Sequence, residues 1–171
     1  MRRAAAALAL VLAVAGPAAA QPADRYVAFM AGSWHVGNAD LNNVTPGITF
    51  GRRAPLAGVA ALPDTEWHVE GGVFLNSYLE VAPLLLGGVS AEVAAGRIGR
   101  LRLGASVGTA YYRELSRSLK SDYGIPNANG FIPIVAATAA LRKGHSDLRL
   151  SVVPPGEDTV AIFNLSLARR F

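Results

Sequence analysis

The sequence predicts an all-β protein, an eight-stranded antiparallel transmembrane β-barrel in the outer membrane of a Gram-negative bacterium. Its first twenty residues have the pattern of a cleaved secretory signal peptide. The remainder stays apolar, but it contains no second run of about eighteen apolar residues that could form a membrane helix. Short alternating strands explain this combination better, and the last of them ends on an aromatic residue, Phe171.

Residues 1–20 place Arg2 and Arg3 before a run of small apolar residues that closes on three alanines. A membrane-anchoring helix is the alternative, but the alanine richness and the small-residue end favour cleavage. We therefore expect a mature protein that begins at Gln21 and is exported. Residues 21–171 are enough for one barrel domain.

The composition excludes several classes of function. The chain has 16 basic and 12 acidic residues, and loss of Arg2 and Arg3 leaves too little positive charge for nucleic-acid binding. It has no cysteine, which excludes disulfides, thiol nucleophiles and zinc-thiolate sites. No carboxylate cluster joins the three histidines, so we expect neither a metal site nor a cofactor. Any catalysis must use serine, histidine, tyrosine or carboxylates.

The C-terminal strand has the clearest alternation. One face carries mainly large apolar residues, and the other face carries mainly small or polar ones. An alternating strand that ends on an aromatic residue resembles the terminal signature by which outer-membrane barrels are recognised during assembly. We therefore expect the outer-membrane assembly machinery to be a partner through the strand that ends on Phe171.

Turn-rich pieces divide the mature chain into eight expected strands, at residues 25–36, 46–56, 66–76, 79–92, 100–113, 131–141, 146–154 and 158–171. Eight is the smallest usual size for such a barrel, and its interior can be filled by side chains or hold one small ligand. Pro83 and Pro133 fall inside strands, where proline removes a hydrogen-bond donor. Each predicts weakened strand pairing, either at a bulge or at a gap through which a lipid chain enters.

Two stretches of the sequence are expected to meet at one rim of the barrel. If the N-terminus lies in the periplasm, odd-numbered strands end at the cell surface, and the surface loops are 37–45, 77–78, 114–130 and 155–157. His35 ends the first strand, while Asn76 and Ser77 close the third. An imidazole can accept the proton of a serine hydroxyl as its oxygen attacks a carbonyl carbon. Ordinary hydrogen bonding at the rim is the alternative.

The stretches GSWHVGNADLNNVTPGITFGRR (residues 32–53) and GGVFLNSYLEVAPLLLGG (residues 71–88) carry a family resemblance. Their order of a histidine, an Asn-rich loop, Pro-Gly and Asn-Ser-Tyr resembles the lipid A palmitoyltransferase (PagP-like) family, and more closely its diverged members. The resemblance implies an outer-membrane barrel that transfers a palmitoyl chain from a phospholipid donor to lipid A. It also implies catalytic groups at the surface rim and an interior that measures the acyl chain.

The resemblance implies that His35 is the general base and that Ser77 and Asn76 position or polarise the ester or the acceptor hydroxyl. Enterobacterial members have an aspartate at the position of Asn76, and asparagine can orient an imidazole without supplying a full charge. The amphipathic N-terminal helix of the family is not evident, since only QPADR precedes the first strand.

The candidate substrate-binding residues lie on the third surface loop and at the end of the strand that precedes it. Arg113, Arg117 and Lys120 would attract the phosphates of lipid A, although a solvated basic loop is an equally simple explanation. Tyr112, beside Tyr111, either hydrogen-bonds substrate or belongs to the aromatic girdle of a membrane barrel.

Two other functions stay open. The resemblance of lipid A deacylases to one another includes a His-x-Ser-Asn pattern near the end of the chain. In this sequence only His145-Ser146-Asp147 comes near that pattern. A non-enzymatic barrel with a structural, adhesion or ligand-binding role predicts that His35 and Ser77 lie far apart and that the interior is packed solid.

Overall fold

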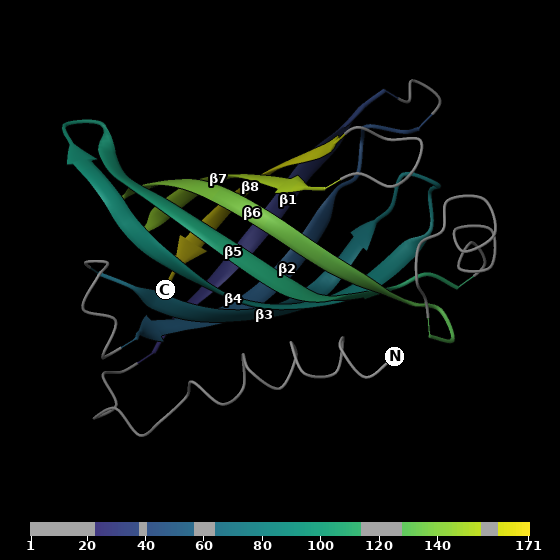
Figure 1. The fold of residues 1–171 in the computed structure, drawn as a ribbon, viewed down its shortest axis with the longest axis horizontal. Helices are drawn as coiled ribbons and strands as arrows, with labels where there is room; N and C mark the ends of the chain where they lie inside the picture. Colours follow the sequence, from purple (N-terminus) through teal and green to yellow (C-terminus); the bar gives the residue numbers. More distant parts are fainter. Residues whose placement is uncertain (1–22, 38–40, 57–63, 114–127, 155–160) are drawn as a thin grey trace.

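The computed structural model describes residues 23–37, 41–56, 64–113, 128–154 and 161–171. These residues form a closed barrel in which each strand pairs antiparallel with its neighbours in the chain and the last strand pairs with the first (Figure 1). The strands are β1 (Asp24–Val36), β2 (Gly47–Pro55), β3 (Glu66–Leu75), β4 (Val81–Gly96), β5 (Gly99–Tyr111), β6 (Phe131–Lys143), β7 (Ser146–Val153) and β8 (Ala161–Arg170). The prediction of an all-β, eight-stranded antiparallel barrel is confirmed, and each expected strand overlaps an observed one.

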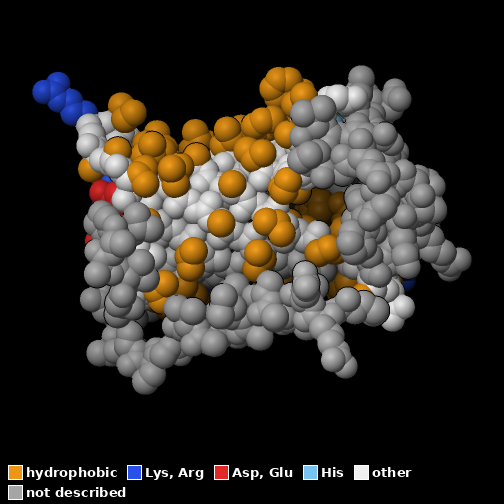
Figure 2. Space-filling model, viewed as in Figure 1, with side chains coloured by type: hydrophobic (Ala, Val, Ile, Leu, Met, Phe, Trp, Pro, Cys, Tyr) orange, Lys and Arg blue, Asp and Glu red, His pale blue; other side chains and the backbone are white. Residues whose placement is uncertain are grey.

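The two faces of the barrel wall differ in composition. Outward positions carry large exposed hydrophobic side chains. Inward positions carry polar and charged side chains at one end of the lumen, and apolar ones at the other end. Figure 2 shows hydrophobic side chains spread over the wall that faces the viewer. Among the described residues, no helix is both long and apolar enough to cross a membrane. The period of two in the sequence therefore separates an outward face, which is apolar along its length, from an inward face, which is charged at one end.

A β-bulge interrupts the alternation of β1. The pairing of β1 with β8 shifts between Met30 and Gly32, which makes Ala31 an extra residue. Before the bulge even-numbered residues up to Met30 line the lumen, and after it Ser33 and His35 do. Trp34 is 64% exposed on the other face. The bulge thus turns His35 inward, because an unbroken alternation from Met30 would turn it outward.

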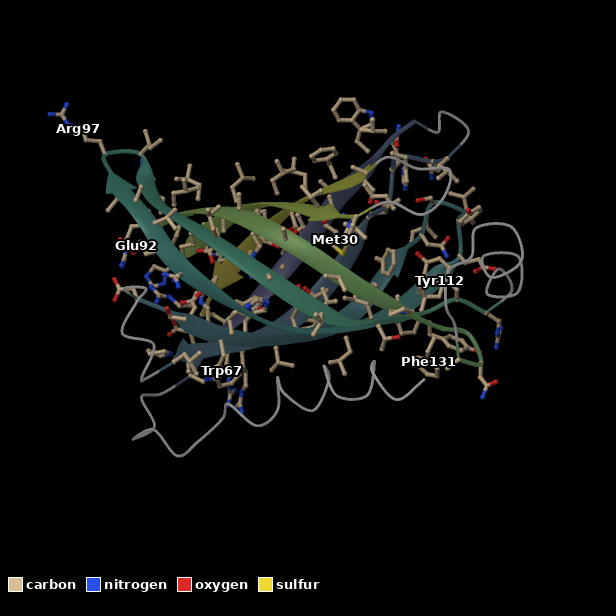
Figure 3. All side chains as sticks on the ribbon, in the orientation of Figure 1. Met30, Trp67, Glu92, Arg97, Tyr112 and Phe131 are labelled. Carbon is tan, nitrogen blue, oxygen red and sulfur yellow. The ribbon has the colours of Figure 1, made fainter. Side chains whose placement is uncertain are left out.

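One end of the lumen holds a network of buried ion pairs. The carboxylate of Asp147 accepts hydrogen bonds from Arg53 and Arg142, and Arg142 also donates to Glu66 with Nη2 2.7 Å from Oε1. The other members are Asp24, Tyr26, Glu70, Arg102, Arg149 and Arg170. Figure 3 shows side-chain nitrogen and oxygen atoms gathered at the end of the barrel near Glu92, with Tyr112 at the opposite end. Buried charges are tolerated here because they are paired.

The wall of the barrel is incompletely paired in the half that lies opposite this network. Strand β6 pairs with β5 as far as Phe131, but with β7 only from Ala137 onward. Pro133 lies in the half of β6 without a β7 partner among the described residues. Figure 2 shows a hollow there, with hydrophobic side chains inside it. The part of the wall that the structure describes therefore has a lateral opening at this place.

Pro83 occupies a similar position in β4. It pairs with Val73 of β3, whereas the pairing of β4 with β5 begins only at Leu84. Both prolines thus lie where a strand is paired on one side alone. Neither lies at a register shift, since those of the described strands fall at Met30/Gly32 and Glu92/Ala94. Among the described residues, both prolines therefore lie beside a missing strand partner and not at a bulge, which is where a strand tolerates the loss of a hydrogen-bond donor.

Candidate active site

The structure brings His35 and Ser77 into direct contact at the end of the lumen opposite the ion pairs. Nε2 of His35 lies 2.7 Å from Oγ of Ser77, and Nδ1 of the same ring lies 3.1 Å from Oδ1 of Asn43. His35 is 6% exposed. A hydroxyl, an imidazole and a side-chain oxygen in this order form the arrangement of a nucleophile, its base and the group that orients the base.

The hydrogen bonds determine which ring nitrogen carries the proton. Oδ1 of Asn43 also lies 3.3 Å from the backbone nitrogen of His35, whose N–H can only donate. The atom between them is therefore the amide oxygen, and Nδ1 of His35 must donate to it. This tautomer leaves a lone pair on Nε2 directed at the hydroxyl of Ser77, which can donate its proton there.

The segment before β2 holds Asn43 against β1. The backbone N–H of Ser33 donates to the carbonyl of Asn43 at 3.0 Å, and the Ser33 hydroxyl lies 2.7 Å from that of Thr45. Gly32 permits this contact, because a Cβ there would lie 2.6 Å from the Asn43 carbonyl oxygen. The backbone N–H of Asn42 donates to the carbonyl of Ser77 at 3.3 Å, which ties the serine to the same segment.

Asn76 shapes the turn that presents Ser77 and does not contact the imidazole. Its Oδ1 accepts hydrogen bonds from the backbone N–H groups of Tyr78 and Glu80, both at 3.0 Å, and its side chain is buried. Leu79 completes the turn at a φ of 66°. The expected orienting role therefore falls to Asn43, which the sequence analysis did not single out. The Asn-rich loop before β2 was the available signal, but it did not distinguish Asn43 from its neighbours.

The candidate substrate-binding residues are only partly described. Tyr112 lines the lumen, and its ring packs edge-on against Phe74 with centroids 6.4 Å apart. Burial, with smaller contributions from Tyr78 and Glu80, raises the pKa of Tyr112 to about 12, so its hydroxyl stays neutral and can donate. Arg113 follows it and is exposed. Arg117 and Lys120 lie outside the described residues.

A cavity of about 360 Å³ lies below the site, within the usual range for small-ligand sites of about 300 to 1,000 Å³. The ion pairs line one of its ends, and His35 and Ser77 line the other. The apolar residues around the second end are Met30, Phe74, Leu84, Leu86, Ile132, Ile134 and Ile162. The interior is therefore not packed solid, and its part nearest the serine suits hydrocarbon.

Two other histidines lie away from this rim. His145 is exposed in the turn between β6 and β7, and the carboxylate of Asp147 nearby is engaged by arginines. His68 on β3 contacts Ser106 on β5, with Nε2 2.9 Å from Oγ. This second His/Ser contact was missed from the sequence because it joins inward positions of strands that are not adjacent.

The Ser77, His35 and Asn43 group can activate a hydroxyl for attack on a carbonyl carbon, next to a cavity that accepts an apolar chain. Among the described residues, no three histidine or acidic side chains are grouped so that they could hold a metal ion. No protein-family model matches the sequence, and no curated protein is similar enough to match it. The function must therefore be argued from the geometry of this group.

Proposed function

We propose that the protein is an outer-membrane acyltransferase that moves a fatty acyl chain, palmitoyl or similar, from a phospholipid to lipid A. The observation that supports this most is the hydrogen bond between Ser77 and His35 at the mouth of an apolar cavity. A pair that can activate a hydroxyl and a space that suits hydrocarbon are the two requirements of acyl transfer. The sequence resemblance points to the same chemistry.

The outer surface of the barrel supports a membrane location. Large apolar side chains on the outward positions of the strands are widely exposed, including Phe29, Trp34, Phe50, Leu85, Leu103 and Val135. Water-soluble proteins rarely expose contiguous apolar surface on this scale. Together with the signal sequence expected at residues 1–20, this surface is the reason to propose the outer membrane.

In the proposed reaction, Oγ of Ser77 attacks the ester carbonyl carbon of the phospholipid while its proton passes to Nε2 of His35. The ester C–O bond then breaks, and the same proton goes to the oxygen of the departing lysophospholipid, which leaves the acyl group on Ser77. A lipid A hydroxyl attacks this acyl-serine and gives its proton to His35. That proton returns to Oγ of Ser77 as the acyl chain leaves, so the enzyme is regenerated.

The opening beside Pro133 supplies a lateral route by which a lipid chain can reach the cavity without crossing the charged end of the lumen. We propose that the hydrocarbon occupies the apolar part, because contact with the buried ion pairs would strip solvent from charges without replacing it. Arg113, with Arg117 and Lys120, would hold the phosphates of lipid A, and Tyr112 would donate a hydrogen bond at the rim.

The proposed function is tested by mass spectrometry of lipid A from a Gram-negative host with and without the protein. We expect lipid A that is heavier by one fatty acyl group, and an equal amount of lysophospholipid released. A lipid A that loses an acyl group would favour a deacylase. An unchanged mass, in cells where the protein is present in the outer membrane, would favour the non-enzymatic barrel and reject the transferase.

Asn43 provides a separate test of the proposed mechanism. We expect Asn43→Leu to lower the rate of transfer about 100-fold while the KM changes little, because the imidazole loses the acceptor that holds its tautomer. Asn43→Asp should restore most of the rate, since a carboxylate oxygen can accept the same two hydrogen bonds. The measurement is acyl transfer by purified protein in mixed micelles.

A side chain with a merely structural role would behave differently at this position. It would raise KM or reduce the yield of folded barrel, and the aspartate variant would not rescue the rate selectively. Wild-type turnover by the Asn43→Leu variant would exclude Asn43 from the mechanism.

A further inference from the structure

Three outward-facing arginines lie together at the end of the barrel opposite Ser77. Arg25 on β1 is directly paired with Arg52 on β2, and Arg169 on β8 is paired with Val27, two positions along β1 from Arg25. All three side chains are exposed. They therefore form one basic patch across three neighbouring strands, and it faces away from the lumen.

The positive charge of this patch is not compensated within the described residues. No ion pair or hydrogen bond joins the side chains of these three arginines to a described residue, whereas the inward arginines are all paired. Asp24, the nearest carboxylate in sequence, is already engaged by Arg53 and Arg170 inside the barrel. Like charges directly opposite each other on a sheet destabilise it. An external anion would remove this repulsion.

A shallow surface hollow adjoins the patch. Arg25, Arg52, Phe50, Val69, Gly71 and Phe171 are among the residues that line it. The hollow thus combines two arginines with three large apolar side chains. Glu70, which also lines it, is already paired with Arg149. A Cβ at Gly71 would lie 3.5 Å from Leu84 O and from Leu85 Cδ1, which is ordinary contact. A side chain would thus fit at Gly71, and its absence leaves the space open.

We propose that this surface binds a phospholipid with a net negative headgroup, in the leaflet that faces the chain termini. The phosphate lies between Arg25 and Arg52, whose guanidinium groups can each donate two hydrogen bonds to it. One acyl chain lies in the hollow against Phe50, Val69 and Phe171. This site rests on the proposed membrane location but not on the transfer reaction, because it faces outward and lies far from Ser77.

The test is native mass spectrometry of the full mature protein in detergent with phosphatidylglycerol or phosphatidylcholine added at equal concentration. We expect the wild type to retain one phosphatidylglycerol molecule in preference to phosphatidylcholine. The Arg25→Gln/Arg52→Gln double variant should bind phosphatidylglycerol about 30-fold more weakly, since each arginine near a lipid surface contributes to anion attraction. Arg97→Gln is the matched control, because Arg97 is exposed in the turn between β4 and β5.

A second variant separates the hollow from the charges. Gly71→Val keeps the arginines and fills the space for the chain, so we expect it to lower retention of phosphatidylglycerol while binding of inorganic phosphate is unchanged. Equal retention of the two lipids by the wild type, or full retention by the double arginine variant, would overturn the proposal. Acyl transfer by the double variant is measured in parallel and should be normal, so failure of the transferase and failure of this site are distinguishable.

Discussion

Ser77→Ala and His35→Ala are each expected to lower acyl transfer to lipid A by at least about 10³-fold, because each removes one member of the pair that activates the nucleophile. With Ser77 absent, the hydroxyl that contacts Nε2 of His35 and would receive the acyl group is gone. With His35 absent, the serine proton has no acceptor at 2.7 Å. The measurement is release of lysophospholipid and acylation of lipid A by purified barrels under single-turnover conditions.

The double variant should be no less active than either single variant, since the two groups act as a unit. Ser106→Ala is the matched control, because it removes a hydroxyl from the other His/Ser contact in the same lumen. We expect it to keep activity within a few-fold of wild type. Substantial transfer by Ser77→Ala would show that the serine is not the nucleophile and would reject the covalent route.

Asp147→Ala is expected to cost about 3 to 5 kcal/mol of the free energy of unfolding, because it leaves two arginines buried without their shared partner. Asp147 is 2% exposed and Arg53 is 4% exposed, so water cannot replace the lost carboxylate. Arg142 would keep Glu66, but the one described carboxylate contact left to Arg53 would be the longer one of 3.9 Å with Asp24, beside its contact with the Tyr26 ring. Equilibrium unfolding of the refolded barrel in denaturant measures the change.

Glu92→Ala is the matched control for this loss of stability. Glu92 also pairs with an arginine in the barrel wall, but Arg100 is 54% exposed. Solvent screening makes such a pair worth about 0 to 1 kcal/mol. If the two alanine variants unfold at the same denaturant concentration, the buried network contributes nothing beyond a surface ion pair, and its proposed role in stability is wrong.

The sequence predicted the barrel well because the wall obeys a simple alternation. In β8, exposed Leu165 and Leu167 alternate with buried Ser166 and Ala168, and this period of two needs no knowledge of distant contacts. The turn-rich segments between the strands then located all eight of them. The predicted bounds differ from the observed ones mainly at strand ends, where pairing depends on the partner strand more than on local sequence.

The site was only partly predictable, for two physical reasons. At the bulge at Ala31, the inward residues of β1 change from even-numbered to odd-numbered positions. One alternating pattern therefore does not describe the strand that carries His35. Asn43 lies outside any strand, and outside strands the sequence has no periodic pattern that would predict its contact with His35. Strand order and direction place Ser77 at the same rim as His35, but their contact also depends on the bulge that turns His35 inward.

The ion pairs inside the barrel also have a consequence for the order of folding. Arg53 and Asp147 are 94 residues apart in the chain, and Arg142 and Glu66 are 76 apart. Neither pair joins adjacent strands, so both can form only when the sheet has curled into a closed cylinder. By then the chain has already lost the entropy that closing long loops costs. Contacts that form this late raise the barrier to unfolding more than they speed folding. We therefore expect the Asp147→Ala variant to unfold faster while folding at nearly the same rate. The charged end of the lumen thus slows the opening of the closed barrel without speeding its formation.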